Sequence, residues 1–319
     1  MKSNILISFI IPHKNIPALL YRSIASIPQR DDIEIIVVDD NSDTDNVDFI
    51  KHSFPQDERL KIIFDKSGKR QGHARNIGLD IARGEWVFFL DADDFLFYSI
   101  NQAIEYCKYS SSDIIYYKST NLDSETFLPG QSRSSITNSS IDLFLSKDKW
   151  GDHMLRYRHP VPWGKFIRRS LIEEHRIRFP EIEKAEDFEF SYLCGHYAKQ
   201  IEGRDISVYC ITTRSGNLTS TVSPSFKMVV INNQIDFLKF MWNKDLKDTP
   251  SYKIVESDVF AIMHYLKSKR DDYNGCYNRL LEIGMTRKYI NYRLRKFGCI
   301  LCYIRIKRTL NSLLHYNFR

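Results

Sequence analysis

The sequence predicts an α/β fold, in which a mostly parallel central sheet has helices on both faces and is followed by a helical C-terminal extension. Apolar runs rich in β-branched and aromatic residues recur along the first 118 residues, and such runs suit strands that are buried on both faces. Amphipathic helical patterns separate these runs, and alternation of strands and helices is typical of parallel sheets. From residue 225 onward only helical patterns are found.

Six apolar runs are the expected strands. They comprise residues 5–11, 33–38, 60–64, 86–90, 113–117 and 206–212. Pro12 ends the first run, and acidic residues follow the second and the fourth. Ligands of such sheets bind beyond the carboxyl ends of the strands. The acidic clusters at 39–43 and 91–94 are therefore the first candidates for a functional site.

Helices are expected between these strands. One apolar stripe comprises Leu19, Leu20, Ser23, Ile24 and Ile27, and a second comprises Ala74, Ile77, Ile81 and Ala82. Gly84 is the expected stop of the second helix. Residues 119–140 are rich in Ser, Thr and Asn, and we expect them to form a surface loop.

The composition is that of a globular protein. Hydrophobic residues make up 43% and charged residues 27% of the 319, which supports a packed core and excludes a disordered chain. No long apolar segment predicts a membrane-spanning helix. The apolar N-terminal run is short and lacks a small-residue cleavage site, so we interpret it as the first strand and expect a cytoplasmic protein. Cys299 and Cys302 have no second pair that would complete a zinc site, and we expect reduced cysteines.

Basic residues are concentrated at the C-terminal end. Residues 287–319 contain nine Lys and Arg and no Asp or Glu, whereas the net charge is +6, so the first 286 residues carry about −3. Aromatic and aliphatic residues lie between these cations, as in a helix pair that lies on an anionic membrane. A solvated basic helix packed on the body is the alternative. No fold signature supports nucleic acid, which is therefore not an expected partner.

Asp91-Ala92-Asp93-Asp94 directly follows the fourth apolar run. Carboxylate oxygens suit Mg²⁺ or Mn²⁺, which also accept phosphate oxygens as ligands. The other interpretation is a helix N-cap with acids in the first turn. Three crowded carboxylates repel one another unless a cation neutralises them, and on that ground we favour metal binding.

Two further loops are candidate nucleotide contacts. Asp39-Asp40-Asn41-Ser42 either accepts N–H bonds from a nucleobase or forms an Asx turn. Residues 68–78 (GKRQGHARNIG) match neither the dinucleotide-binding pattern nor the P-loop. They place glycines and cations ahead of a helix N-terminus, which suits a diphosphate, and a solvated basic loop is the alternative.

Three motifs in the second half of the chain carry groups that could belong to a site. Asp187 begins a helix above the apolar stripe of Phe190, Cys194 and Tyr197, so its carboxylate is either a satisfied cap or a site base. Trp163, in Trp-Gly-Lys, can stack on a sugar, and Arg214 can pair with a diphosphate. Each motif is more often structural when it occurs alone.

Taken in order, these motifs resemble an inverting glycosyltransferase of family 2 with the GT-A fold, of the type that builds bacterial surface glycans. The segments that carry the resemblance are SFIIP at 8–12, VVDDNSD at 37–43, ARNIGLDIARGEWVFFLDADD at 74–94, WGKFIRRSLI at 163–172, AEDFEF at 185–190 and TRSGNLTS at 213–220. We accordingly expect a catalytic domain over 1–222, with a nucleotide-sugar-binding half (1–118) and an acceptor half (119–222). The helical region with the basic tail would cover 223–319.

The resemblance implies a role for each candidate residue. Asp40 would bind a uracil-type base, and Asp91 and Asp93 would hold a metal, Mn²⁺ or Mg²⁺, together with the nucleotide. Asp187 would be the general base. The nucleotide-sugar site would also include Pro12, Arg75 and Arg214, and the acceptor site would include Trp163 and Glu186. Where many relatives have an aromatic residue after the first strand, this chain has Lys14, a cation that could face the base or the phosphate.

The implied reaction is a direct displacement that moves a sugar from a nucleoside-diphosphate donor, a UDP-sugar, to a hydroxyl of a glycan or a lipid-linked oligosaccharide. It inverts the anomeric centre and needs no covalent enzyme intermediate. The expected location is the cytoplasm, with peripheral contact at the inner face of the membrane. Two other classes stay open: a nucleotidyltransferase, which would need glycines after the first strand that this chain lacks, and a non-catalytic glycan- or lipid-binding protein.

Overall fold

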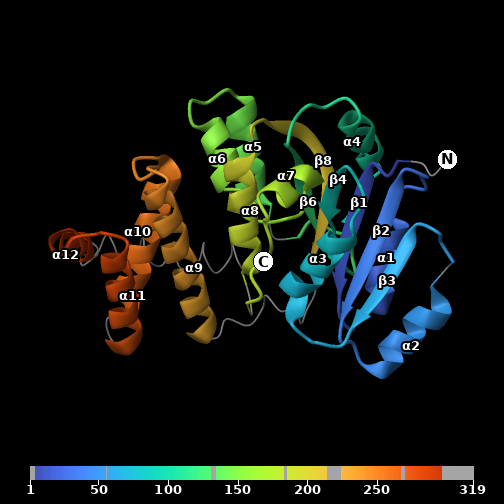
Figure 1. Ribbon diagram of the computed structural model, residues 1–319, viewed down its shortest axis with the longest axis horizontal. Helices are drawn as coiled ribbons and strands as arrows, with labels where there is room; N and C mark the ends of the chain where they lie inside the picture. The colour runs from blue at the N-terminus through green and yellow to red at the C-terminus, as the bar shows by residue number, and fades with distance from the viewer. Residues whose placement is uncertain are drawn as a thin grey trace. The chain divides into compact units, whose positions relative to one another are not determined.

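The computed structural model describes residues 4–54, 56–130, 134–182, 185–213, 224–266 and 270–296 (Figure 1). Contacts within the chain define two compact units, Met1–Arg214 and Ser215–Arg319. The domain boundary predicted at 222/223 lies outside the described residues, so that division of the chain stays a prediction.

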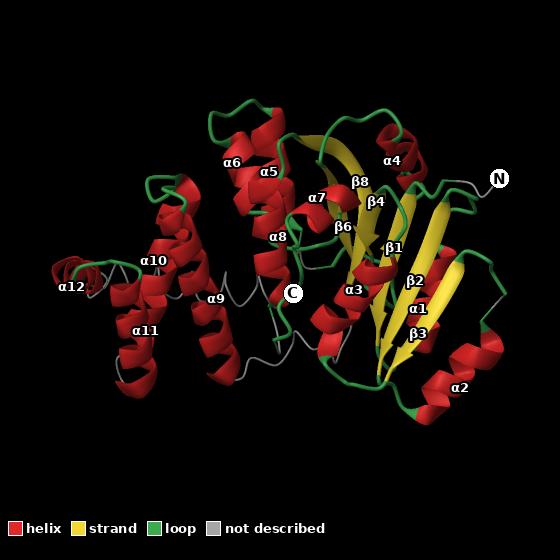
Figure 2. Ribbon diagram, viewed as in Figure 1, coloured by secondary structure: helices red, strands yellow, loops and turns green. Residues whose placement is uncertain are grey.

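An eight-stranded sheet forms the centre of the first unit, in the order β3-β2-β1-β4-β7-β6-β8-β5. Figure 2 shows the strands of this sheet in yellow, with β3, β2 and β1 side by side. The strands are β1 (Ile7–His13), β2 (Ile33–Asp40), β3 (Leu60–Asp65), β4 (Trp86–Phe89), β5 (Phe95–Leu96), β6 (Ile114–Asp123), β7 (Lys165–Arg168) and β8 (Ile201–Thr213). Strands β3, β2, β1 and β4 are parallel to one another, and β6 is parallel to β8. Strand β7 runs antiparallel to both β4 and β6, and β5 runs antiparallel to β8. The predicted α/β class is confirmed, and its parallel half is the half that the sequence pattern marks most clearly.

Helices cover both faces of this sheet. They are α1 (Pro17–Ala25), α2 (Thr44–Ser53), α3 (Arg70–Ile81), α4 (Ile100–Cys107), α5 (Ser135–Leu145), α6 (Gly151–Tyr157), α7 (Arg169–Glu174) and α8 (Glu186–Tyr197). One buried cluster joins the strands to α1, α2 and α4, and a second joins them to α3, α5, α6, α7 and α8. The two faces are therefore covered by different helices, as the prediction requires.

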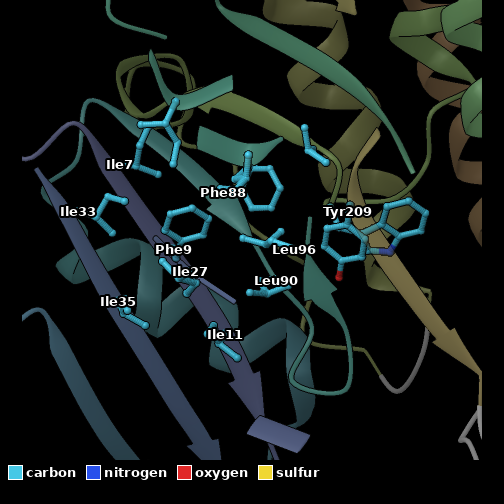
Figure 3. Close-up of a cluster of buried hydrophobic side chains, with 14 of the residues drawn as sticks. Ile7, Phe9, Ile11, Ile27, Ile33, Ile35, Phe88, Leu90, Leu96 and Tyr209 are labelled. Atoms are coloured by element: carbon cyan, nitrogen blue, oxygen red, sulfur yellow. The ribbon is translucent and has the colours of Figure 1, made fainter. Parts of the chain in front are cut away.

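Alternate residues of each central strand point to opposite faces. Phe9 and Phe88 belong to the cluster on the α1 side, which Figure 3 shows, whereas their neighbours Ile10 and Phe89 belong to the cluster on the α3 side. All four side chains are fully buried. This explains why these strands are continuous apolar runs without a polar face.

Several boundaries differ from the sequence expectation. Strand β1 continues through Pro12 to His13, because beyond Ile10 it pairs with β2 alone and no ladder bond is needed on the β4 side. The expected surface loop at 119–140 is partly wrong: β6 extends to Asp123 and α5 begins at Ser135. Ser, Thr and Asn are tolerated in this strand because β8 pairs with its whole length.

The second unit is helical over its described residues. It contains α9 (Pro224–Asn243), α10 (Pro250–Tyr265), α11 (Arg270–Glu282) and α12 (Arg287–Lys296). The buried carboxylate of Glu256 on α10 accepts hydrogen bonds from Arg293 and from the Tyr289 hydroxyl on α12. Across the described part of the chain, no helix combines the length and the apolar character needed to cross a membrane.

Candidate active site

The sheet order brings two acidic loops to one edge. Strands β2 and β4 lie on either side of β1 and run parallel to it, so their carboxyl ends meet there. Asp39 and Asp40 end β2, and Asp91 follows β4 after one residue. The site predicted beyond the carboxyl ends of these strands therefore has its acids in the expected place.

Arg75 on α3 is the centre of the site. Its guanidinium donates through Nη2 to Oδ1 of Asp91 at 2.8 Å, and through Nη1 to Oδ1 of Asp187 at 2.7 Å and Oε1 of Glu186 at 3.1 Å. Only 1% of the Arg75 side chain is exposed. One buried cation thus holds the acid that follows β4, 16 residues away in sequence, and the two acids that begin α8, 111 and 112 residues away.

A close approach between α3 and the start of α8 makes this arrangement possible. A Cβ atom at Gly72 would lie 2.9 Å from the carbonyl oxygen of Pro180 and 3.0 Å from Cγ of Glu186. Any larger residue would push the two segments apart. Ala185, directly before α8, has a φ of +62°, a left-handed conformation that costs a non-glycine residue about 1 kcal/mol or more. Strain of this kind is found at functional sites.

The electrostatics of the site favour a proton on Asp187 at neutral pH. Burial raises the pKa of the Asp187 carboxyl to about 8, with Glu186 and Asp91 acting in the same direction and the Arg75 guanidinium opposing them. Burial also raises the pKa of Glu186, again against Arg75. The side chain of Asp187 remains 27% exposed, whereas that of Glu186 is 1% exposed. Of the two acids, Asp187 is the one that a substrate can reach.

The loop that carries Asp91, Asp93 and Asp94 is fixed mainly by β8. The hydroxyl of Tyr209 donates to Oδ2 of Asp94 at 2.8 Å and accepts the N–H of Asp91 at 3.0 Å. The N–H of Thr212 donates to Oδ1 of Asp94 at 2.7 Å, and burial raises the pKa of Asp94 well above its usual range. Asp94 is therefore a structural residue of this loop.

These contacts weaken the argument that the three crowded acids require a metal, because two of the acids are compensated within the protein. Arg75 already provides a cation for Asp91, and burial favours the neutral form of Asp94, which also accepts two hydrogen bonds. Among the described residues no group of three or more His, Cys, Asp or Glu could hold a metal ion. Mg²⁺ and Mn²⁺ need only one or two carboxylates when phosphates and waters complete the shell. Carboxylate oxygens are suitable donors for such an ion, and its binding by Asp91 and Asp93 stays a prediction.

The loop after β2 is held by a buried histidine. Nδ1 of His13 lies 2.7 Å from Oδ2 of Asp39, and Nε2 of His13 accepts the N–H of Ile16, which places the ring proton on Nδ1. Asp39 also accepts from the N–H and Oγ of Ser42. Burial disfavours the charge on Asp39, but the bonds from His13 and Ser42 outweigh it and lower its pKa. The Asx-turn interpretation thus describes Asp39.

The side chain of Asp40 contacts different groups from that of Asp39. Its Oδ1 accepts the N–H of Arg70 at the first residue of α3, and its Oδ2 lies 3.6 Å from Nζ of Lys14. Lys14 is half exposed, whereas the Asp40 side chain is 7% exposed. The cation predicted to face the base or phosphate therefore lies beside the predicted base-binding acid. Contact of either residue with a nucleotide stays a prediction.

The remaining predicted site residues lie in different settings. Pro12 is buried in β1, opposite Val38. The indole of Trp163 is 8% exposed and stacks on the ring of Tyr209, with centroids 5.1 Å apart. Trp163 therefore lies in the core, and it contacts Tyr209, whose hydroxyl binds the acid loop. Arg214 lies outside the described residues. The roles predicted for these residues stay predictions.

Sequence reasoning missed Tyr209, Thr212 and Arg22. The guanidinium of Arg22 donates to the carbonyl oxygen of Asp93 at 2.5 Å, and Oγ1 of Thr212 donates to the same oxygen at 2.5 Å. No local motif marks these residues, because their importance depends on the packing of α1 and β8 against the acid loop.

Comparison with known families identifies the class of protein. The model of the family described as Glycosyl transferase family 2 matches residues 8–198, and the chain belongs to this family. The predicted family resemblance is thereby confirmed.

Individual relatives fall into the same group. The chain is 26% identical over 330 residues to the poly(ribitol-phosphate) beta-N-acetylglucosaminyltransferase TarP of Staphylococcus aureus, covering 96% of this chain and 89% of TarP. It is 27% identical to EpsJ of Bacillus subtilis, an uncharacterized glycosyltransferase, over 67% of this chain and 63% of EpsJ. Against EpsH of the same organism the match covers 49% of that protein. The chain thus spans about half to two thirds of the length of the two Bacillus relatives.

Solved structures show the same fold. The crystal structure of S. aureus TarS residues 1–349 in complex with UDP-GlcNAc superposes with a TM-score of 0.61, over 98% of this chain and 90% of that chain at 18% identity. The mannosyltransferase PcManGT of Pyrobaculum calidifontis, in complex with GDP-Man and Mn²⁺, superposes with a TM-score of 0.53 over 97% of this chain and 84% of that chain at 15% identity. The predicted fold is confirmed.

Proposed function

We propose that this protein transfers a sugar from a UDP-sugar to a hydroxyl of a bacterial cell-surface polymer or its lipid-linked precursor, with inversion at the anomeric carbon. The observation that carries this proposal is the Arg75 cluster, which holds Asp91 of the nucleotide edge and Asp187 of α8 on one guanidinium. A carboxylate that can take a proton lies next to the place where a nucleoside diphosphate would bind.

In the proposed reaction Asp187 is the general base. Its carboxylate takes the proton of the acceptor hydroxyl while the acceptor oxygen forms a bond to the anomeric carbon. The bond from that carbon to the diphosphate oxygen breaks, and the electron pair leaves with the nucleoside diphosphate. Attack opposite the leaving group inverts the centre. The raised pKa of Asp187, about 8, is near the pH at which a base is most effective.

The donor is held by the residues at the carboxyl edge. We assign Asp40 and Lys14 to the nucleobase, Pro12 to the wall of the same subsite, and Arg214 to the diphosphate. Asp93 and Asp91 would hold Mn²⁺ or Mg²⁺. When bound, such an ion neutralises the charge that develops on the leaving diphosphate. In this assignment Arg75 acts on the donor through Asp91, because its guanidinium is buried and forms ion pairs with three carboxylates.

The names of the relatives support the acceptor class and the stereochemistry. TarP and TarS are both poly(ribitol-phosphate) beta-N-acetylglucosaminyltransferases. A β-linked product from an α-linked nucleotide sugar is the outcome of inversion. Glu186 and Trp163 would lie on the acceptor side of the site, Glu186 through its contact with Arg75 beside Asp187.

The same proposal implies where in the cell the protein acts. Nucleotide sugars are made in the cytoplasm, and lipid-linked acceptors lie at the inner face of the membrane. The basic helix α12 supports peripheral contact with an anionic membrane, because Arg287, Lys288, Arg295 and Lys296 are exposed on it.

The experiment that tests the function compares the unchanged protein with Asp187→Asn. Release of UDP from UDP-GlcNAc and UDP-glucose is measured with poly(ribitol phosphate) as the acceptor probe, and UDP affinity is measured by calorimetry. We expect Asp187→Asn to lose about 10²–10⁴ in rate with UDP affinity nearly unchanged. Glu189→Gln, an exposed acid in the same helical turn, is the matched control. Undiminished transfer by Asp187→Asn, or a retained anomer, would refute the assignment.

A further inference from the structure

An arginine on α1 joins two segments at the edge of the proposed site, and the reaction outlined above does not use it. Nη2 of Arg22 donates to the carbonyl oxygen of Asp93 at 2.5 Å, in the acid loop at residues 91–94. Nη1 of the same guanidinium donates to Ser124, to its carbonyl oxygen at 3.4 Å and to its hydroxyl oxygen at 3.3 Å. Ser124 comes directly after β6, which ends at Asp123. One side chain thus links the loop after β4 to the turn after β6.

Both segments lie at the edge of the sheet where the donor is proposed to bind. Strand β7 is antiparallel to β4 and to β6, so β4 and β6 run in the same direction. Their carboxyl ends therefore lie at the same edge as Asp40, which ends β2. The sheet order places β2 on one side of β4 and β6 on the other. Arg22 therefore connects the acid loop to the side of the site that lies away from the proposed nucleobase contacts.

The turn after β6 is a fixed partner for Arg22. Oδ1 of Asp123 accepts the N–H groups of Glu125 and Thr126, at 3.1 and 2.9 Å. The carbonyl oxygen of Asp123 accepts the N–H of Phe127 at 3.0 Å. Phe127 has a φ of +56°, a left-handed conformation that a non-glycine residue keeps only where the surrounding structure holds it. These bonds fix the turn, so a group that is bound to the turn is fixed as well.

Neutral groups hold the guanidinium of Arg22. It donates to oxygens of Asp93, Ser124 and Thr212, which are carbonyl and hydroxyl oxygens. Its Cζ lies 5.4 Å from the centre of the Phe95 ring. Among the residues that the structure describes, none of the oxygens that accept from Arg22 belongs to a carboxylate. Several neutral acceptors are matched by the fork of donors that a guanidinium carries, so these contacts indicate a residue that sets geometry and not one that completes an ion pair.

The geometry that Arg22 sets is that of the Asp93 main chain. The carbonyl oxygen of Asp93 accepts from Nη2 of Arg22 and from Oγ1 of Thr212, both at 2.5 Å. Within the loop, the N–H of Asp94 donates to the carbonyl oxygen of Asp91 at 3.0 Å, which closes the turn. The contacts of Arg22 and Thr212 are with the main chain of Asp93, so they fix this residue without using its carboxylate.

We propose that Arg22 is a positioning residue, which together with Thr212 fixes the main chain of Asp93 and so directs the carboxylates of the acid loop toward the donor diphosphate. This inference rests on the proposed function, in which Asp91 and Asp93 hold the nucleotide and its metal. Arg22 does not touch the donor in this proposal. Because a misplacement of about 1 Å in a site can cost about 10²-fold in rate, a contact that fixes the loop contributes to function without contacting the substrate.

The test is the affinity of UDP for Arg22→Met, measured by calorimetry in the presence of Mn²⁺ and accompanied by the melting temperature of the variant. Asp93 loses one of the two groups that hold its carbonyl oxygen. We expect UDP to bind about tenfold more weakly, a change of the size expected for one charge-assisted hydrogen bond. Thr212→Val removes the other group with little change in shape, and it should weaken UDP binding in the same direction.

Arg59→Met is the matched control. Arg59 also donates to a main-chain carbonyl oxygen, that of Pro28, but it lies directly before β3, at the opposite edge of the sheet. This variant should bind UDP as tightly as the unchanged protein does, even where its melting temperature falls.

Unchanged UDP affinity in a folded Arg22→Met, or an equal loss of affinity in Arg59→Met, would overturn the proposal and show that Arg22 only stabilises the fold. Should Arg22→Met fail to fold, unchanged affinity in a folded Thr212→Val would overturn it in the same way. Absence of UDP binding by the unchanged protein would instead overturn the proposed function itself and, with it, the role of Arg22.

Discussion

Nη1 of Arg75 lies 2.7 Å from Oδ1 of Asp187, a residue 112 positions further along the chain. Helix α3 supplies the cation and helix α8 the acid, and both helices pack on the same face of the sheet. Because Arg75 also holds Asp91 at the end of β4, one side chain fixes the distance between the proposed donor site and the proposed base. Loss of this cation should therefore affect both stability and catalysis.

Replacing Arg75 tests that dependence. Arg75→Met leaves three carboxylates in a largely buried site without their cation, and breaking a buried ion pair in this way is unfavourable by about 3–5 kcal/mol. Urea unfolding should show a loss of that order. Arg178→Met, at an arginine that pairs on the surface with Asp80 of the same helix, should change stability by less than about 1 kcal/mol. Equal stability losses in the two variants would show that the cluster does not depend on Arg75.

The raised pKa of Asp187 predicts opposite pH trends for stability and for activity. In the unfolded chain its pKa has the ordinary value of 3.8, and in the folded protein burial raises it to about 8. Between these values the folded state binds a proton that the unfolded state does not, so stability falls as the pH rises from about 4 to about 8. Transfer requires the ionised form, so kcat/KM rises over the same window.

Thermal unfolding between pH 5 and pH 8 checks this prediction. Glu186 and Asp94 also have raised pKa values from burial and give slopes of the same sign, so the comparison is made with Asp187→Asn. The variant should show a flatter decline and should exceed the unchanged protein in melting temperature most at the upper end of the range. Parallel curves for the two proteins would place the pKa of Asp187 in its ordinary range.

The sequence predicts the parallel half of this fold well. Strands β1, β2 and β4 are buried along their whole length because both of their faces are covered, and their apolar runs are visible in the sequence without any partner. Helix α4 buries Ile100, Ala103, Ile104 and Cys107, which recur at helical spacing in the sequence. Strands β5 and β7, with two and four residues, are too short to give a pattern and exist only through pairing with β8, β4 and β6.

The candidate site likewise contains residues that sequence motifs identify and residues that only the folded structure brings together. Motifs identify Asp40, Asp91 and Asp187, since each follows a strand or begins a helix. The sequence does not predict that Arg75 is shared among the acids, because this depends on the close approach of α3 to α8 at Gly72. Nor does it predict that Tyr209 holds Asp91 and Asp94, which requires the pairing of β5 with β8.

The metal assignment predicts a specific change in nucleotide affinity. Calorimetry with UDP should show tighter binding in the presence of Mn²⁺ or Mg²⁺, and Asp93→Ala should remove that difference because the proposed site loses a carboxylate ligand. Asp80→Ala, at an acid on α3 that pairs with Arg178 on the surface, should keep the metal dependence. Equal affinity with and without metal in the unchanged protein would end the metal assignment.

The basic helix α12 predicts salt-sensitive binding to anionic membranes. Arg293 is tied to the buried Glu256, and Ile290 and Leu294 pack inward, so one face of the helix is fixed on its unit. The exposed cations Arg287, Lys288 and Arg295 lie on the part of the helix that is not packed inward. Each basic residue close to an anionic surface contributes about 1 kcal/mol, an effect that salt screens.

Co-sedimentation of the full chain with vesicles measures this effect. Anionic vesicles should bind the protein and neutral ones should not, and Lys288→Glu with Arg295→Glu should weaken binding by about 2 kcal/mol or more, at least about thirtyfold. The control pair Lys239→Glu with Lys253→Glu changes the net charge equally, at exposed positions on α9 and α10. A general charge effect would weaken both pairs alike, whereas a membrane-facing α12 weakens only the first. Equal pelleting with neutral and anionic vesicles would show that α12 is a solvated helix packed on its own unit.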